Sequence, residues 1–144
     1  MSDDGDRTPL DDGDELLLRQ VHPSFVRDGR PSGQAFKPTK KDQGMLSVAR
    51  SSVSSPADAF HLHTAVLGLP SQGTWGISVS ECQRHQLKAF PDPVTSPPEK
   101  VADPAHAFID FRGLSNGRTE SKATQLRNDA LVRGRLHPPG DAQS

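Results

Sequence analysis

The amino-acid sequence predicts an α+β protein, a single small domain with a mixed sheet of four or five strands packed by two main helices. Its 144 residues are typical of one domain. Short apolar runs bounded by turn residues recur along the chain and indicate strands. Two longer stretches carry helix-capping residues and apolar positions at helical spacing. Short strands mixed with a pair of helices are typical of the α+β class.

The first third of the chain is expected to hold three strands. An apolar run at residues 16–21 fits a first strand, and Pro23 disfavours a helix at His22. The turn-rich stretch "RDGRPSG" follows, then a short strand over residues 34–37 and a second loop. Residues 45–49 have the composition of another strand.

The clearest helix is expected within "SSPADAFHLHTAVLGLP". Ser55 is placed as its N-cap and Pro56 as its first residue, while Gly68 and Pro70 end it. A second helix is expected over residues 118–133. Its apolar stripe is formed by Ala123, Leu126, Ala130 and Leu131.

The segment between these helices is expected to contain three further strands. Residues 73–79 alternate large apolar with small residues, which predicts a half-buried strand, and Ser80 is placed as the cap of a short helix. Strands at 88–90 and 105–111 flank the proline-rich connector "PDPVTSPPEKVADP". The expected core consists of Leu17, Val21, Phe36, Leu46, Val48, Phe60, Leu67, Trp75, Ile77, Val79, Leu126 and one or more of Phe108, Ile109 and Phe111.

The domain is expected to span residues 15–137, between two disordered tails. Residues 1–14 are rich in Asp and Gly and form an acidic tail, and residues 138–144 form the second tail. The first fifteen residues carry a net charge of −6 and the remainder +5. A solubilising tail is the simpler interpretation, and masking of a basic surface is the alternative.

Several functional classes are excluded by what the sequence lacks. It has no apolar run long enough to span a membrane and no signal-peptide pattern at its start, which predicts a cytoplasmic protein without a membrane partner. The single cysteine, Cys82, excludes an internal disulfide and a cysteine-rich zinc site. No GxSxG, GxxxxGK[ST], GxGxxG, HExxH or paired CxxC motif is present, and no cofactor is predicted.

Two features that suggest chemistry have simpler explanations. His61 and His63 lie in the expected helix about 200° apart around its axis, so they are not expected to share a metal ion, although one of them can still face a cleft. Cys82 lies near the start of a short helix, where a thiol can act as a nucleophile, but buried packing is the expected role. No metal site is therefore predicted.

Six polar residues form the candidate catalytic set, and all are offered as candidates only. An Arg can hold an anionic ligand and a His can act as a general base. His106 and Asp110 share a strand face but lie about 13 Å apart along it, too far for a direct hydrogen bond. His106 could instead meet His22 or Arg19 of the first strand, but a histidine whose hydrogen bonds are satisfied within the sheet is the favoured interpretation. The candidates are Arg19, His22, Ser32, Ser47, His61 and His106.

Nucleic-acid binding is not favoured. The last helix and its end carry a net charge of +3, which gives weak attraction to phosphates. Aromatic residues make up only 5% of the chain and tyrosine is absent, so surfaces for base stacking are scarce. A solvated surface helix is the expected role.

The order of "LLLRQVHPSFVRDGRPSGQAFKPT", "KDQGMLSVARSS", "GTWGISVSECQ" and "PAHAFIDF" resembles a group of small bacterial proteins for which no activity is assigned, over about residues 16–137. The start is also similar to ADP-ribosyltransferase-like folds. That similarity implies an Arg or His on the first strand and a Ser on a later one, places that Arg19, His22 and Ser47 would take. The Glu that those folds carry on a late strand has no counterpart here.

Two functional hypotheses follow. The first is a small cytoplasmic bacterial accessory module that binds a partner protein and catalyses no reaction. The alternative is a small transferase or hydrolase whose cleft is built from Arg19, His22, Ser47 and His106. The second hypothesis requires these side chains to converge in one concave pocket.

Overall fold

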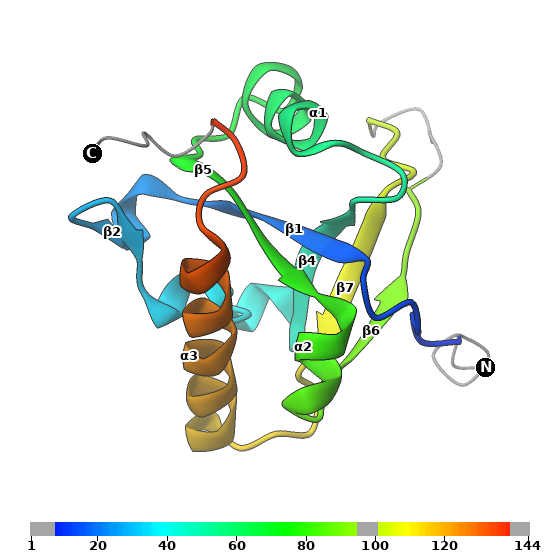
Figure 1. Ribbon diagram of the computed structural model, residues 1–144, viewed down its shortest axis with the longest axis vertical. Coiled ribbons are helices and arrows are strands. Elements are labelled where there is room, and N and C mark those ends of the chain that lie inside the picture. The colour runs from blue at the N-terminus through cyan, green and yellow to red at the C-terminus, as the bar shows by residue number, and fades with distance from the viewer. Residues whose placement is uncertain (1–7, 95–100, 139–144) are drawn as a thin grey trace.

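A computed structural model describes residues 8–94 and 101–138, and in it one five-stranded sheet organises the chain (Figure 1). The strand order is β5-β1-β4-β7-β6, and every pairing is antiparallel. The α+β class and the strand number are confirmed, whereas the sheet is antiparallel and not mixed. The strands are β1 (Leu16–Val21), β4 (Met45–Arg50), β5 (Gly73–Ser78), β6 (Lys88–Pro91) and β7 (His106–Asp110), with a separate pair β2 (Val26–Arg27) and β3 (Arg30–Pro31).

Helices cover both faces of the sheet. On one face α1 contacts β1 and β5. On the other face α3 contacts β5, and α2 contacts β5 and β6 (Figure 1). The helical elements are α1 (Pro56–His61), which continues as the π-helical turn η5 (Leu62–Val66), α2 (Val79–Arg84), α3 (Asn116–Arg133) and the short 3-10 helices η2 (Pro23–Phe25), η3 (Gly33–Phe36) and η4 (Lys40–Asp42).

The core lies between the sheet and the two helices α2 and α3. Alternate residues of a strand point to the same face, so Leu17 and Val21 of β1 enter this core together. From α3 the predicted stripe Ala123, Leu126 and Ala130 is buried against them. Most predicted core residues are confirmed as buried, but two are not. Leu67 follows the π-helical turn, where the chain leaves the sheet, and is 44% exposed, and Phe60 is only half-buried.

Two local predictions are corrected by the structure, and a third is confirmed. Residues 34–37 do not form a strand, because η3 packs as a 3-10 helix against α3 and tertiary packing overrides the local signal. The short helix is capped by Ser78 and not by Ser80, since the Glu81 carboxylate accepts from the Ser78 backbone and completes a capping box. The predicted N-cap Ser55 is confirmed, and its hydroxyl accepts from Asp58 N.

Strand β5 is buried along its whole length and is not half-buried as predicted. Its second edge is covered by the segment after α3: Thr74 N donates to His137 O at 2.7 Å, and Leu136 N donates to Thr74 O at 2.8 Å. The approach is close enough to require glycine, because a Cβ on Gly73 would lie 2.5 Å from Arg135 Cδ. The chain after α3 is therefore part of the folded body up to this contact.

The segment that precedes β1 also lies on the body. Leu10 packs against the core cluster, and its N–H donates to Ala89 O at 2.8 Å. Glu15 is buried beside the start of β1, where its carboxylate accepts from Arg50 Nε and Nη2, both at 3.1 Å, and from the Ser52 hydroxyl. The predictions for residues 1–7 and 139–144 fall outside the described residues.

Strand β1 is paired unequally along its two edges. All six of its residues pair with β5, whereas only Leu17 and Leu18 pair with β4. Beyond Leu18 the two strands separate, although β4 continues to pair with β7. This gap in the sheet positions the candidate site.

Candidate functional site

Arg19 fills the gap between β1 and β4. Its Nε donates to Ala35 O at 2.9 Å, and its Nη1 donates to Ser47 O at 3.0 Å. The second bond takes the place of the strand pairing that the Ser47 carbonyl would otherwise make with β1. The guanidinium is thus fixed in place by two backbone carbonyls.

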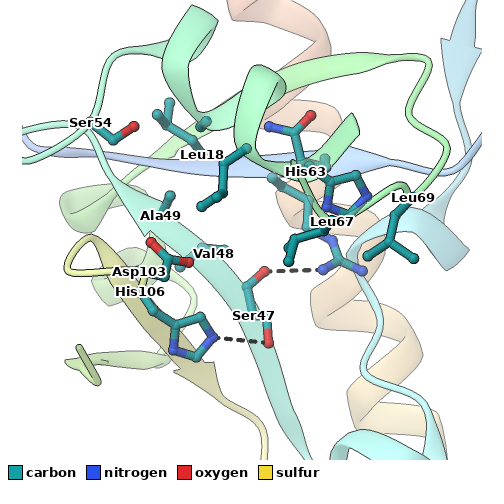
Figure 2. Close-up of a pocket in the computed structure, with 14 residues that line it drawn as sticks. Leu18, Ser47, Val48, Ala49, Ser54, His63, Leu67, Leu69, Asp103 and His106 are labelled. Carbon is teal, nitrogen blue, oxygen red and sulfur yellow. Dashed lines mark hydrogen bonds between the residues drawn. The ribbon is translucent and has the colours of Figure 1, made fainter. Parts of the chain in front are cut away.

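A pocket of about 300 Å³ opens beside this gap, beneath α1 and η5. Figure 2 shows Ser47 in the middle of its lining, with His106 and Asp103 on one side and His63, Leu67 and Leu69 on the other. The polar lining residues are Arg19, Gln20, Ser47, Ser54, His63, Asp103 and His106, and the remaining lining is aliphatic.

His106 links Ser47 to Asp92. Its Nδ1 lies 3.1 Å from Asp92 Oδ2 and 3.0 Å from Asp92 O, and its Nε2 lies 3.3 Å from Ser47 Oγ. Both partners of Nδ1 are acceptors, so the ring proton belongs on Nδ1 and Nε2 accepts from the Ser47 hydroxyl. A carboxylate, an imidazole and a hydroxyl joined in this order form the arrangement that activates a serine nucleophile.

The register of three strands creates this arrangement. In the β4–β7 pairing Ala49 lies opposite His106 and Ser47 opposite Phe108, so Ser47 and His106 are diagonal neighbours on one face. In the β6–β7 pairing Pro91 lies opposite Ala107, which brings the following residue, Asp92, alongside His106; Asp92 N donates to His106 O at 2.8 Å. The backbone ladder therefore holds all three side chains together.

Arg19 and His63 both line the pocket but differ in charge. Burial lowers the pKa of Arg19 and the charge of Asp42 opposes this, but a guanidinium stays protonated in proteins. Burial also lowers the pKa of His63; a hydrogen bond to the Pro70 carbonyl opposes this, and the charges of Arg19 and His22 lower it further. His63 is therefore neutral near pH 7, and Arg19 supplies the positive charge on its side.

Three of the six candidate residues line this pocket, namely Arg19, Ser47 and His106. The other three lie outside its lining. The His22 ring is exposed and caps η2 by accepting from Ser24 N at 3.0 Å. Ser32 is exposed at the N-cap position of η3, where its side chain makes no capping hydrogen bond, and His61 is exposed at the end of α1.

Sequence reasoning missed two residues of the site, Asp92 and Asp103, and it chose the wrong member of the pair His61 and His63. His63, and not His61, is the histidine of the expected helix that faces the cleft. A signal for Asp92 was present, because pairing the two strands that flank the proline-rich connector as a hairpin places "FPD" against "AHAF". Nothing comparable in the sequence indicates Asp103.

Other predicted features are structural. Cys82 is fully buried, and burial, with smaller contributions from the charges of Glu81 and Asp129, raises the pKa of its thiol to about 12. The packing role is therefore favoured over the nucleophile. Among residues 8–94 and 101–138, no three His, Cys, Asp or Glu side chains gather to hold a metal ion. The same residues include no helix with the length and apolar composition to cross a membrane.

Comparison of the chain with protein-family models, with curated proteins and with solved structures found no match. The similarities to the bacterial group and to ADP-ribosyltransferase-like folds stay predictions.

Proposed function

We propose that this protein is a small hydrolase in which Ser47 attacks a carbonyl carbon of a ligand held in the pocket. The observation that carries the proposal is the hydrogen-bonded series Asp92–His106–Ser47, whose last two members line the pocket that also contains Arg19. Ser47 has a histidine that can accept its proton, and His106 has a carboxylate that orients its ring. Ser47 is also the exposed member of the three.

The chemistry follows from the proton positions. As Ser47 Oγ forms a bond to the carbonyl carbon, His106 Nε2 takes the hydroxyl proton and Asp92 stabilises the imidazolium through Nδ1–H. His106 then returns the proton to the leaving group as the bond to that group breaks, which leaves an acyl ester on Ser47. Water, deprotonated by the same nitrogen, hydrolyses the ester and restores the hydroxyl.

The pocket limits the ligand. Its volume of about 300 Å³ lies at the lower end of the range for ligand sites. The aliphatic walls favour an apolar portion, and the fixed guanidinium of Arg19 favours an anionic group. A small molecule with a short apolar body is therefore the expected substrate, rather than a polymer that extends far beyond the pocket.

A fluorophosphonate probe and a p-nitrophenyl ester test the proposal. The probe is expected to label Ser47, located by peptide mass spectrometry, and Ser47→Ala or His106→Gln is expected to reduce ester hydrolysis by at least about 100-fold. Ser121→Ala removes an exposed hydroxyl on α3 and serves as the matched control. Equal hydrolysis by wild type and Ser47→Ala would rule the hydrolase out.

A protein-binding accessory module, acting in the cytoplasm, is the second candidate. It is favoured by three exposed apolar side chains at the end of η5 and beyond it: Val66, Leu67 and Leu69 are 50%, 44% and 47% exposed. A photo-crosslinking amino acid at Val66 is expected to capture one partner in the host cell, whereas the same group at Val132 on α3, which is 90% exposed, captures none. Identical adduct patterns at both positions would argue against this module.

A further inference from the structure

We propose that the natural ligand of the pocket is a small zwitterion of the dipeptide class, with its carboxylate bound by Arg19 and its ammonium group by Asp103. The proposal rests on the proposed hydrolase in one respect only, since it places the ligand's central carbonyl at Ser47. The binding it describes can be measured without any reaction.

Arg19 has hydrogen-bonding capacity that its two bonds to backbone carbonyls leave unused. A guanidinium has five N–H groups. Nε–H and one N–H of Nη1 are donated to the carbonyls of Ala35 and Ser47. Asp42, the carboxylate that acts on Arg19, is itself engaged by Thr39 in a capping box. The remaining N–H groups have no partner among the described residues, and they belong to a side chain that lines the pocket.

Asp103 supplies a second charged group to the pocket lining. Asp103 is fixed by its backbone, which exchanges two hydrogen bonds with Val94, both at 2.9 Å. Its carboxylate lines the pocket and has no hydrogen-bond or ion-pair partner in the described part of the chain. In the view of Figure 2 it lies beside His106, on the opposite side of Ser47 from His63.

Opposite charges at two ends of one pocket select a ligand that carries both. An anion alone would leave Asp103 unpaired and partly desolvated, and a cation alone would leave Arg19 in that state. In a dipeptide the ammonium and carboxylate groups lie on either side of the peptide carbonyl. Arg19, which donates to the Ser47 carbonyl at 3.0 Å, would hold the carboxylate, and Asp103, which lines the same pocket, would hold the ammonium group. Leu67 and Leu69, which lie beside His63, then pack against one apolar side chain of the dipeptide. A pocket of about 300 Å³ accommodates no larger ligand.

The corresponding reaction balances without a cofactor. Ser47 Oγ bonds to the peptide carbonyl carbon, the C–N bond breaks, and the amine of the second residue leaves with the proton from His106. The first residue remains as an ester on Ser47 until water releases it. One dipeptide and one water thus give two free amino acids.

Three matched ligands test the inference on the Ser47→Ala protein, in which no turnover occurs. They are Ala-Leu, N-acetyl-Ala-Leu, which lacks the ammonium, and Ala-Leu amide, which lacks the carboxylate. Ala-Leu is expected to bind about tenfold more tightly than either derivative, as measured by calorimetry or by NMR titration. Adding Asp103→Asn is expected to reduce the affinity for Ala-Leu to that for N-acetyl-Ala-Leu, whose own affinity does not change.

Asp58→Asn is the matched control, because it removes an exposed carboxylate on α1 that does not line the pocket. N-acetyl-Ala-Leu binding as tightly as Ala-Leu, or Asp103→Asn affecting all three ligands equally, would overturn the inference. Its failure is distinguishable from that of the hydrolase. Probe labelling of Ser47 without ligand discrimination removes the zwitterion alone, and discrimination without labelling removes the hydrolase alone.

Discussion

The two halves of β1 differ in what lies along their β4 side. Leu17 and Leu18 pair with β4 and continue the sheet, and the buried carboxylate beside their end, Glu15, is neutralised by Arg50. In the second half the strands separate, and Arg19 takes the place of the missing pairs with bonds to carbonyls only. The charge of Arg50 is neutralised by Glu15 and stabilises the fold. A charge held by carbonyls is fixed in position but keeps its attraction for a ligand.

The largest effect is expected in the paired half. Leu17 is fully buried in the core, so Leu17→Ala is expected to lower the free energy of unfolding by about 2–5 kcal/mol, in urea denaturation. The folded fraction should still bind ligand in the pocket, because the lost packing lies on the other side of the sheet. A decrease in the free energy of unfolding below about 1 kcal/mol would mean that Leu17 is not tightly packed in the core.

A smaller loss of stability is expected in the separated half. Arg19→Met removes the donors of two carbonyls, and it is expected to cost about 1–3 kcal/mol because water from the pocket can replace them in part. Arg27→Met, at an exposed arginine of β2, is the control and should change stability by less than about 0.5 kcal/mol. Equal effects of the two substitutions would show that Arg19 does not hold the gap.

Acid should weaken the paired half in particular. Burial alone would raise the pKa of Glu15, but the hydrogen bonds from Arg50 and Ser52 outweigh it and hold the pKa below its ordinary value of 4.5. The ionised group therefore contributes stability that is fully present above about pH 4.5 and is lost as the pH falls through the folded pKa.

Glu15→Gln is expected to flatten the acid limb of stability measured by urea unfolding between pH 7 and pH 3. Part of the limb should persist, because hydrogen bonds from Arg133 and from the Ser78 backbone outweigh burial and lower the pKa of Glu81 as well. An unchanged acid limb in Glu15→Gln would show that this ion pair adds no pH-dependent stability.

The smallest effect concerns the pocket and begins at higher pH. The pKa of His63 is lowered first by burial and then by neighbouring charges, so the unfolded chain binds its proton more readily than the folded chain does. Stability should be complete above the ordinary pKa of 6.5, fall as the pH drops below it, and level off beneath the folded pKa. NMR titration of the His63 ring is the direct measurement, and a pKa above 6.5 would contradict the packing around Arg19.

Local signals in the sequence were enough for most of the fold but not for the site. The cap at Ser55 and the stripe on α3 depend on neighbours a few residues away, so they could be predicted. The contact of Ser47 with His106 joins residues 59 positions apart, and it depends on a strand register that no local pattern specifies. The gap that Arg19 fills exists only because β1 leaves β4 after two pairs, which is a property of the assembled sheet.

The covered edge of β5 has a consequence for association between molecules. On the side away from β1, both backbone groups of Thr74 bond to the segment after α3, Gly76 O accepts from Arg133, and Ser78 N donates to Glu81. These groups would otherwise form a template for a strand from another chain, the first step towards domain swapping or fibre growth. The segment that follows α3 thus protects the sheet against polymerisation, and its removal should make the protein prone to aggregate.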